Sequence, residues 1–419
     1  MRYFLLSLAL GFPSLTSLSA FPFLSAQVDP QVADYETLQP VPVTGFVPGT
    51  LLTNPHYTVD PIARPDGLHL TYGLEGMDGV ESITGTQSLA IRTTEIKALA
   101  ELDKIDNSAE FGKALLKAGA GKVESVKDAV KDPLGTVQRL PLGASRLLGR
   151  VSTSVKNAAE GNADPRAGAE AVLGVRRTKG ELAARLGVSP YTKNTALQSK
   201  LDVTARAMAG GALVVNLSGL VISGGVGTAI SVVNVNQTLQ RTLIESTPEE
   251  MTVNNRAALM ALKATPDEVE GFLANPSFSP WQKTILTADL KDLGQNPDPF
   301  LRLASKGSSP EELLDLMQVA QILLKHHRDT AAVVSVREVD GVLAALDAND
   351  ALVAPVGADL ILWTSLNESR AKTLQGMAKE DPRVKTVALA TEGLVSARAA
   401  QEFSKRSILT IPLALGPMR

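Results

Sequence analysis

The chain has 419 residues, of which 44% are hydrophobic, 4% are aromatic and none is cysteine, and its formal net charge is −3. This length allows about two or three domains with buried cores, and the apolar fraction excludes a disordered chain. The lack of cysteine excludes disulfides, thiolate zinc sites, iron–sulfur clusters, cysteine nucleophiles and a lipoprotein anchor, and the near-neutral charge argues against binding of nucleic acid by the whole protein.

Residues 1–26 have the layout of a secretory signal peptide. Arg2 is the only charge in this segment, and an apolar run, Tyr3–Phe12, follows it. The run is too short to span a bilayer, and small residues after it provide a cleavage region. Cleavage is expected after Ala26 or, alternatively, after Ala20. We therefore expect an exported protein of the bacterial periplasm or cell envelope, whose stability cannot come from disulfides.

Residues 27–92 are expected to form a proline-rich arm and a small β unit. Prolines recur between positions 30 and 65, and no helical periodicity is present, which predicts an extended segment. Alternating apolar and polar residues then predict one strand at Leu68–Tyr72 and a second at Val80–Ile91, with Gly85 inside it.

Residues 93–328 are predicted to form a helical domain. Three segments each place Thr or Ser, then Pro, then two acids in succession: Thr247–Glu250, Thr265–Glu268 and Ser309–Glu312. In such a segment the hydroxyl can accept from free backbone N–H groups, the proline has a helical φ, and the acids face the positive end of the helix dipole. These segments predict helix starts and carry no information on chemistry.

Residues 329–419 are predicted to form a C-terminal mixed α/β unit. Apolar runs at 332–336, 342–346 and 351–354 are separated by turn residues and predict hairpin strands. The later elements are three strands, 359–363, 384–390 and 408–411, which alternate with two helices, 366–378 and 396–405. This β-α-β-α-β order favours at least one parallel pair. The predicted fold class is therefore α+β.

Residues 207–233 form a 27-residue segment without a charge. The small residues Gly219, Ser223, Gly227 and Ser231 recur in it at every fourth position, and on a helix they would form a stripe that allows close packing. The segment is long enough to cross a bilayer. However, its glycines weaken a helix, and a large helical domain ordinarily contains one apolar helix. A buried helix, a buried hairpin and a membrane segment therefore stay open.

The preceding residues, 134–206, are basic. They include 12 Lys and Arg against 5 Asp and Glu, a net charge of +7. Basic helices beside an apolar segment can approach an anionic membrane surface.

Residues 181–189 resemble the first helix and turn of a helix-turn-helix motif. Pro190 interrupts the would-be recognition helix, and Lys193 stands where that motif has an apolar residue. We instead expect a helix to end at Gly187 and another to begin near Asn194, and we expect no nucleic acid as a partner.

Four residues are candidates for lining a pocket: His326, His327, Asp359 and Trp363. Adjacent histidines point to different sides of a helix, so His326 and His327 do not form a chelating pair. They either mark a helix end or pair with distant acids in a hydrolase site. Asp359 and Trp363 flank a predicted strand, and Trp363 is expected in the core or at a pocket beyond the end of that strand.

No nucleophile, phosphate-binding or metal motif is supported. Ser369–Lys372 has the spacing S-x-x-K but is interpreted as the polar face of a helix, and His56 and His69 as ordinary strand or loop residues. We expect no cofactor and no metal, and the sequence leaves open whether the chain is an enzyme.

Three phrases, Asp132–Thr136, Leu186–Asn194 and Pro276–Gln282, together resemble a group of exported bacterial proteins of unknown function. The resemblance implies export and no mechanism. The first expectation is a non-enzymatic envelope protein that binds another envelope protein or a ligand. The alternatives are a membrane-associated protein that uses segments 134–206 and 207–233, and a hydrolase with a site near His326 and His327.

Overall fold

The computed structural model describes residues 34–76, 79–106, 165–210 and 237–413. The chain divides into two compact units, residues 1–35 and 36–419, and all elements below belong to the second. The fold class is α+β, as predicted. The predicted signal peptide, residues 134–164 and residues 211–233 lie outside the described residues, and with them Gly219, Ser223, Gly227 and Ser231.

The N-terminal part is an antiparallel sheet around β5 (Leu70–Gly76). Strand β5 pairs with β6 (Gly79–Thr84), and the full order is β1-β4-β5-β3-β2 with β6 beside β5. Alternate residues of β5, namely Leu70, Tyr72 and Leu74, are buried, so one face of the sheet covers a core. The smaller elements are β1 (Val41–Pro42), the 3-10 helix η1 (Val43–Gly45), α1 (Gly49–Leu52), β2 (Thr53–Asn54), β3 (Tyr57–Val59) and β4 (Ile62–Pro65).

Two expectations for this region are wrong. The proline-rich segment contains short strands and is not simply an arm, because strands of two to four residues pair with longer neighbours and carry no periodicity of their own. The second predicted strand stops at Thr84. Gly85 adopts a φ of 90°, which a side chain would disfavour, and helix α2 (Thr86–Asp106) follows it.

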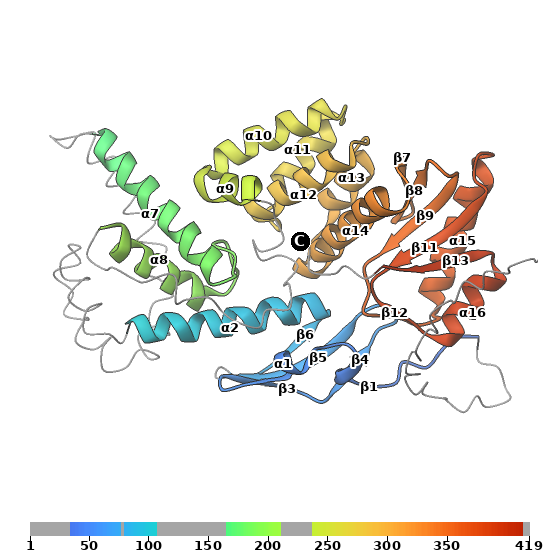
Figure 1. The fold of residues 1–419 in the computed structure, drawn as a ribbon, viewed down its shortest axis with the longest axis horizontal. Helices are drawn as coiled ribbons and strands as arrows, with labels where there is room; N and C mark the ends of the chain where they lie inside the picture. The colour runs from blue at the N-terminus through green and yellow to red at the C-terminus, as the bar shows by residue number, and fades with distance from the viewer. Residues whose placement is uncertain (1–33, 77–78, 107–164, 211–236, 414–419) are drawn as a thin grey trace, which may run out of the picture. The chain divides into compact units, whose positions relative to one another are not determined.

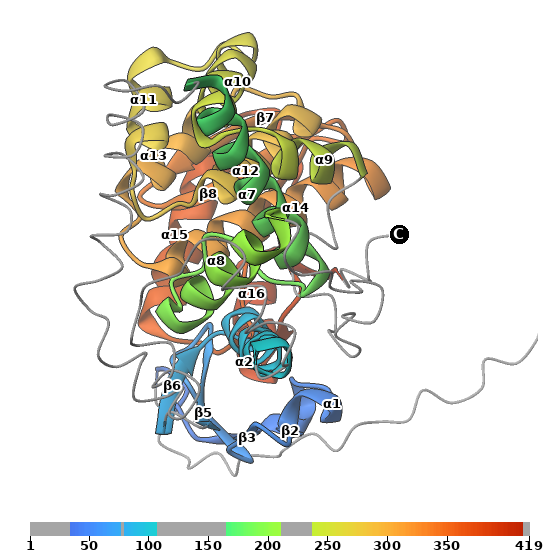
Figure 2. The same cartoon turned by 90° about the vertical axis from the view of Figure 1, so that its left-hand side faces the viewer.

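Helix α2 packs against α8 (Thr195–Ala209), which in turn packs on α7 (Pro165–Arg185), and Figure 2 shows α2 and α8 side by side. Gly187 follows α7 with a φ of 68°, and the Asn194 side chain accepts from the Leu197 N–H at the start of α8. The predicted helix end and the next helix start are therefore confirmed.

A second helical group has a continuous core that includes Phe272, Trp281 and Phe300. Thr247 and Ser309 form capping boxes with Glu250 and Glu312, which confirms two of the predicted helix starts. The third predicted helix also begins after Thr265, although that hydroxyl bonds to Asp298 in place of a backbone N–H. The helices are α9 (Gln237–Glu245), α10 (Pro248–Ala261), α11 (Pro266–Ala274), α12 (Pro280–Leu293), α13 (Asp298–Lys306) and α14 (Pro310–Asp329).

The C-terminal part contains a five-stranded mixed sheet in the order β13-β11-β9-β8-β7. Strands β7, β8 and β9 form the predicted antiparallel hairpins, and β11 and β13 are parallel, as the β-α-β-α-β order favoured. The strand parallel to β11 on its other side is β9, whereas the predicted strand 359–363 is limited to Leu360–Ile361 and pairs with Leu394–Val395 in a separate two-stranded sheet. These elements are β7 (Val333–Val339), β8 (Val342–Asp347), β9 (Ala351–Val356), β10 (Leu360–Ile361), α15 (Ser365–Glu380), β11 (Thr386–Thr391), β12 (Leu394–Val395), α16 (Ala397–Lys405) and β13 (Ile408–Pro412).

Helices cover both faces of this sheet. Alternate residues of β9 point to opposite faces: Val353 packs with Ile322 of α14, whereas Leu352 and Ala354 share a core with residues of α15 and α16. In Figure 1, α14 lies on one side of the sheet and α15 and α16 lie on the other. Among the described residues, no helix combines the length and the apolar character needed to cross a membrane.

Candidate functional site

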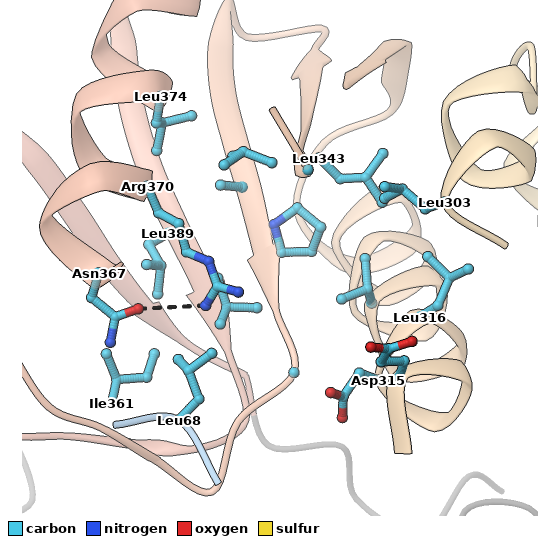
Figure 3. A pocket seen from close by; sticks show the side chains of 18 of the residues that line it. Leu68, Leu303, Asp315, Leu316, Leu343, Ile361, Asn367, Arg370, Leu374 and Leu389 are labelled. Carbon is cyan, nitrogen blue, oxygen red and sulfur yellow. Dashed lines mark hydrogen bonds between the residues drawn. The ribbon is translucent and has the colours of Figure 1, made fainter. Parts of the chain in front are cut away.

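A cavity of about 410 Å³ lies where α14, α15, the start of β8 and the carboxyl end of β9 meet the loop before β5. Its volume is within the range of small-molecule pockets, roughly 300–1,000 Å³. Figure 3 shows aliphatic side chains around most of it. These include Leu303, Leu316, Leu343, Ile361, Leu374 and Leu389.

Arg370 and Lys306 are the Arg and Lys residues in the lining of this largely apolar cavity. Arg370 belongs to α15, and its side chain extends into the cavity beside Leu389 (Figure 3). Nη1 of Arg370 donates to Oδ1 of Asn367 over 3.5 Å, and no other partner of the guanidinium is found in the described part of the chain. Burial lowers the pKa of Arg370, although the carboxylates of Asp315 and Asp66 partly oppose this shift.

Asn367 is held rigidly one helical turn before Arg370. It is 3% exposed, and its Nδ2 donates to the carbonyl oxygens of Gly67 (3.0 Å) and Leu362 (2.8 Å). These two bonds leave Oδ1 directed to Arg370, so the amide orients the guanidinium. The same side chain ties α15 to the loop before β5.

On the opposite wall, α14 contributes Asp315, whose Oδ2 lies 3.0 Å from Nε2 of His69. Burial alone would lower the pKa of His69, but the hydrogen bond and charge of Asp315, helped by the charges of Asp359 and Asp66, outweigh burial and raise it. Oδ1 of Asp66 accepts from the N–H groups of Leu68 and His69, at 2.8 Å each, and so fixes the loop that presents the ring.

Asp359, in the loop before β10, joins this loop to β5 and to the start of α2. Its carboxylate accepts from the N–H of Leu70 at 2.9 Å and from the N–H of Thr86 at 3.1 Å. The second bond satisfies a free donor at the start of α2. Burial raises the pKa of Asp359, and these hydrogen bonds oppose the shift. Asp359 therefore stabilises the arrangement of the cavity walls and borders only a small adjoining void of about 20 Å³.

The other predicted site residues lie away from the cavity. His326 is 1% exposed, and its Nε2 lies 2.9 Å from Oδ2 of buried Asp347. Oδ1 of Asp347 accepts from the N–H groups of Asn349 and Ala351, so this pair closes the β8–β9 turn. Nδ1 of His327 accepts from the N–H of Val333.

Trp363 is buried in the C-terminal core. Its ring contacts Phe403 edge to face, with 5.5 Å between centroids, and the Arg406 guanidinium lies 4.5 Å from its centroid. It therefore has the role of a core residue, which was one of its two expected roles.

The residues that converge on the cavity, Arg370, Asn367, His69 and Asp315, are not among the predicted site residues. Arg370 lies within the S-x-x-K segment interpreted as a polar helix face, and His69 was interpreted as an ordinary residue. The scarcity of histidine was the only local signal, and it does not distinguish His69 from the other three.

No group of three or more His, Cys, Asp or Glu residues that could hold a metal ion occurs in the described ranges. Comparisons with protein-family models, curated proteins and solved structures found no match to this chain.

Proposed function

We propose that this chain is an exported binding protein whose cavity holds a small, largely apolar molecule. The cavity itself supports this proposal: its volume of about 410 Å³ is lined by side chains from the loop before β5, from α13 and α14, and from the C-terminal sheet and helices. Pockets of this kind bury most of a ligand in an apolar lining and orient it with a few polar groups.

Export rests on the charge, apolar run and small residues of positions 1–26 and on the absence of cysteine. Fusing residues 1–40 to a reporter enzyme that folds only outside the bacterial cytoplasm tests it. Reporter activity that disappears when residues 3–12 are deleted supports export, and an inactive fusion contradicts it.

Binding is tested with Nile red, an uncharged dye that fluoresces in apolar surroundings. We expect saturable binding of one dye per chain. Val319→Trp should reduce the affinity at least about tenfold, because Val319 of α14 lines the cavity and an indole there takes up space that the dye needs. The matched control is Val253→Trp on α10, since Val253 is 60% exposed and lies outside the lining.

Dye binding that is absent, or equally strong in the two tryptophan variants, contradicts a ligand site in this cavity. Thermal unfolding of both variants verifies that they are folded.

A further inference from the structure

We propose that the ligand carries a carboxylate at the end of an apolar body, and that Arg370 binds this carboxylate. This inference rests on the proposed function and names the class of molecule that the cavity would hold.

The first argument is the state of the Arg370 guanidinium. It has five N–H donors, and the only hydrogen bond found for it among the described residues is to Asn367, at 3.5 Å. Placing a cation in an apolar cavity is costly unless an anion pairs with it. A carboxylate has the planar geometry to accept two parallel N–H bonds from a guanidinium.

The second argument is that the nearby acids already have other partners. Asp315 pairs with His69 on the far wall, and Oδ1 of Asp66 accepts two backbone N–H groups. Glu312 is exposed and accepts from the N–H groups of Ser308 and Ser309 in the capping box of α14. In Figure 3 the Arg370 guanidinium faces the interior of the cavity, with Asp315 across from it.

The third argument is the lining around the guanidinium. Leu374 and Leu389 flank Arg370, and Leu303, Leu316 and Leu343 lie across the cavity. Such surroundings limit the access of water to an ion pair and suit an aliphatic or aromatic body. A molecule with an apolar body and a carboxylate at one end matches this group of leucines around Arg370.

The test compares three ten-carbon probes that differ only at the head: decanoate, decanol and decylamine. Each displaces Nile red at pH 7.5, below its micelle-forming concentration. We expect decanoate to bind about 10-fold to 100-fold more tightly than decanol, the range for hydrogen bonds to a charged group. Decylamine should bind more weakly than decanol, because the positive charge of its ammonium group is repelled by the guanidinium of Arg370.

Substitutions then locate the effect. Arg370→Gln should abolish the preference for decanoate over decanol, and thermal unfolding verifies that the variant folds. Arg370→Lys keeps the charge without the two-pronged geometry and should retain part of the preference. The matched control, Arg241→Gln, changes a side chain that is 75% exposed on α9 and should have no effect.

Equal binding of decanoate and decanol overturns this inference and leaves the proposed function standing. Tightest binding of decylamine also overturns it, because the anchor would then be Asp315. If wild-type protein binds neither Nile red nor decanol nor decanoate, the proposed function itself fails.

Discussion

Nε2 of His69 lies 3.0 Å from Oδ2 of Asp315, and this contact joins the loop between β4 and β5 to the N-terminal half of α14. With Asn367, which bonds to the carbonyl oxygen of Gly67, it holds elements from distant parts of the sequence around one cavity. The walls of the cavity therefore depend on polar contacts between regions of the chain.

The His69–Asp315 pair should make stability depend on pH. Because the pKa of His69 is raised in the folded protein, its contribution is fully present below the ordinary pKa of histidine and is lost as pH rises through the raised value. The pair is partly exposed, so we expect about 0.5–1 kcal/mol between pH 6 and pH 8. Urea unfolding, monitored by tryptophan fluorescence, measures this difference.

His69→Gln and Asp315→Asn should each remove this part of the pH dependence, and the double variant should lose no more than either single one. A wild-type pH profile retained in Asp315→Asn would show that the pair does not contribute.

Asp289 should destabilise the protein at high pH. Burial, followed by the charge of Asp292, raises its pKa to about 7, and Oδ2 of Asp289 is buried without a hydrogen-bond partner among the described residues. Between the ordinary range of an aspartate and pH 7, the folded state keeps a proton that the unfolded state releases. Stability therefore falls as pH rises through this interval and levels off above it.

Asp289→Asn removes this titration. We expect the variant to be more stable than wild type by about 1–3 kcal/mol at pH 8 and nearly equal at pH 4. Asp340→Asn, a change in an exposed turn, is the control and should shift stability equally little at both pH values. A constant difference for Asp289→Asn across the pH range would contradict the titration.

His326 should prove structural and not part of the ligand site. His326→Ala leaves the buried Asp347 carboxylate without its partner, which should cost about 3–5 kcal/mol of unfolding free energy. The affinity for Nile red should stay within about twofold of wild type, a change of less than 0.5 kcal/mol. A variant that remains stable but no longer binds the dye would place His326 in the site.

Asp359 should support the junction of the loop before β10 with β5 and the start of α2. Asp359→Ala leaves the Leu70 and Thr86 N–H groups without acceptors, and we expect a loss of about 2–4 kcal/mol in unfolding free energy. Asp359→Asn keeps one acceptor oxygen and should lose less than half as much. Hydrogen exchange of the Thr86 amide is a local readout, and unchanged protection in Asp359→Ala would contradict the capping role.

The sequence predicts those elements whose signals are local. The succession of hydroxyl, proline and acids at Thr247 and Ser309 contains the whole capping box of α10 and of α14, so a few adjacent residues are sufficient. In the same way, turn residues between apolar runs locate β7, β8 and β9. The start of α2 was missed because Thr86 is capped by Asp359, which no local pattern around Thr86 reveals.

The sequence by itself therefore determined the α+β class, most helix starts after residue 246, and the hairpin strands and a parallel pair of the C-terminal unit. The candidate site was decided only by the tertiary structure. Arg370 and His69 look locally like a helix surface residue and a loop residue, and their chemistry depends on what packs around them. Folding surrounds Arg370 with leucines and pairs His69 with Asp315, and burial and charge then change what each side chain can bind.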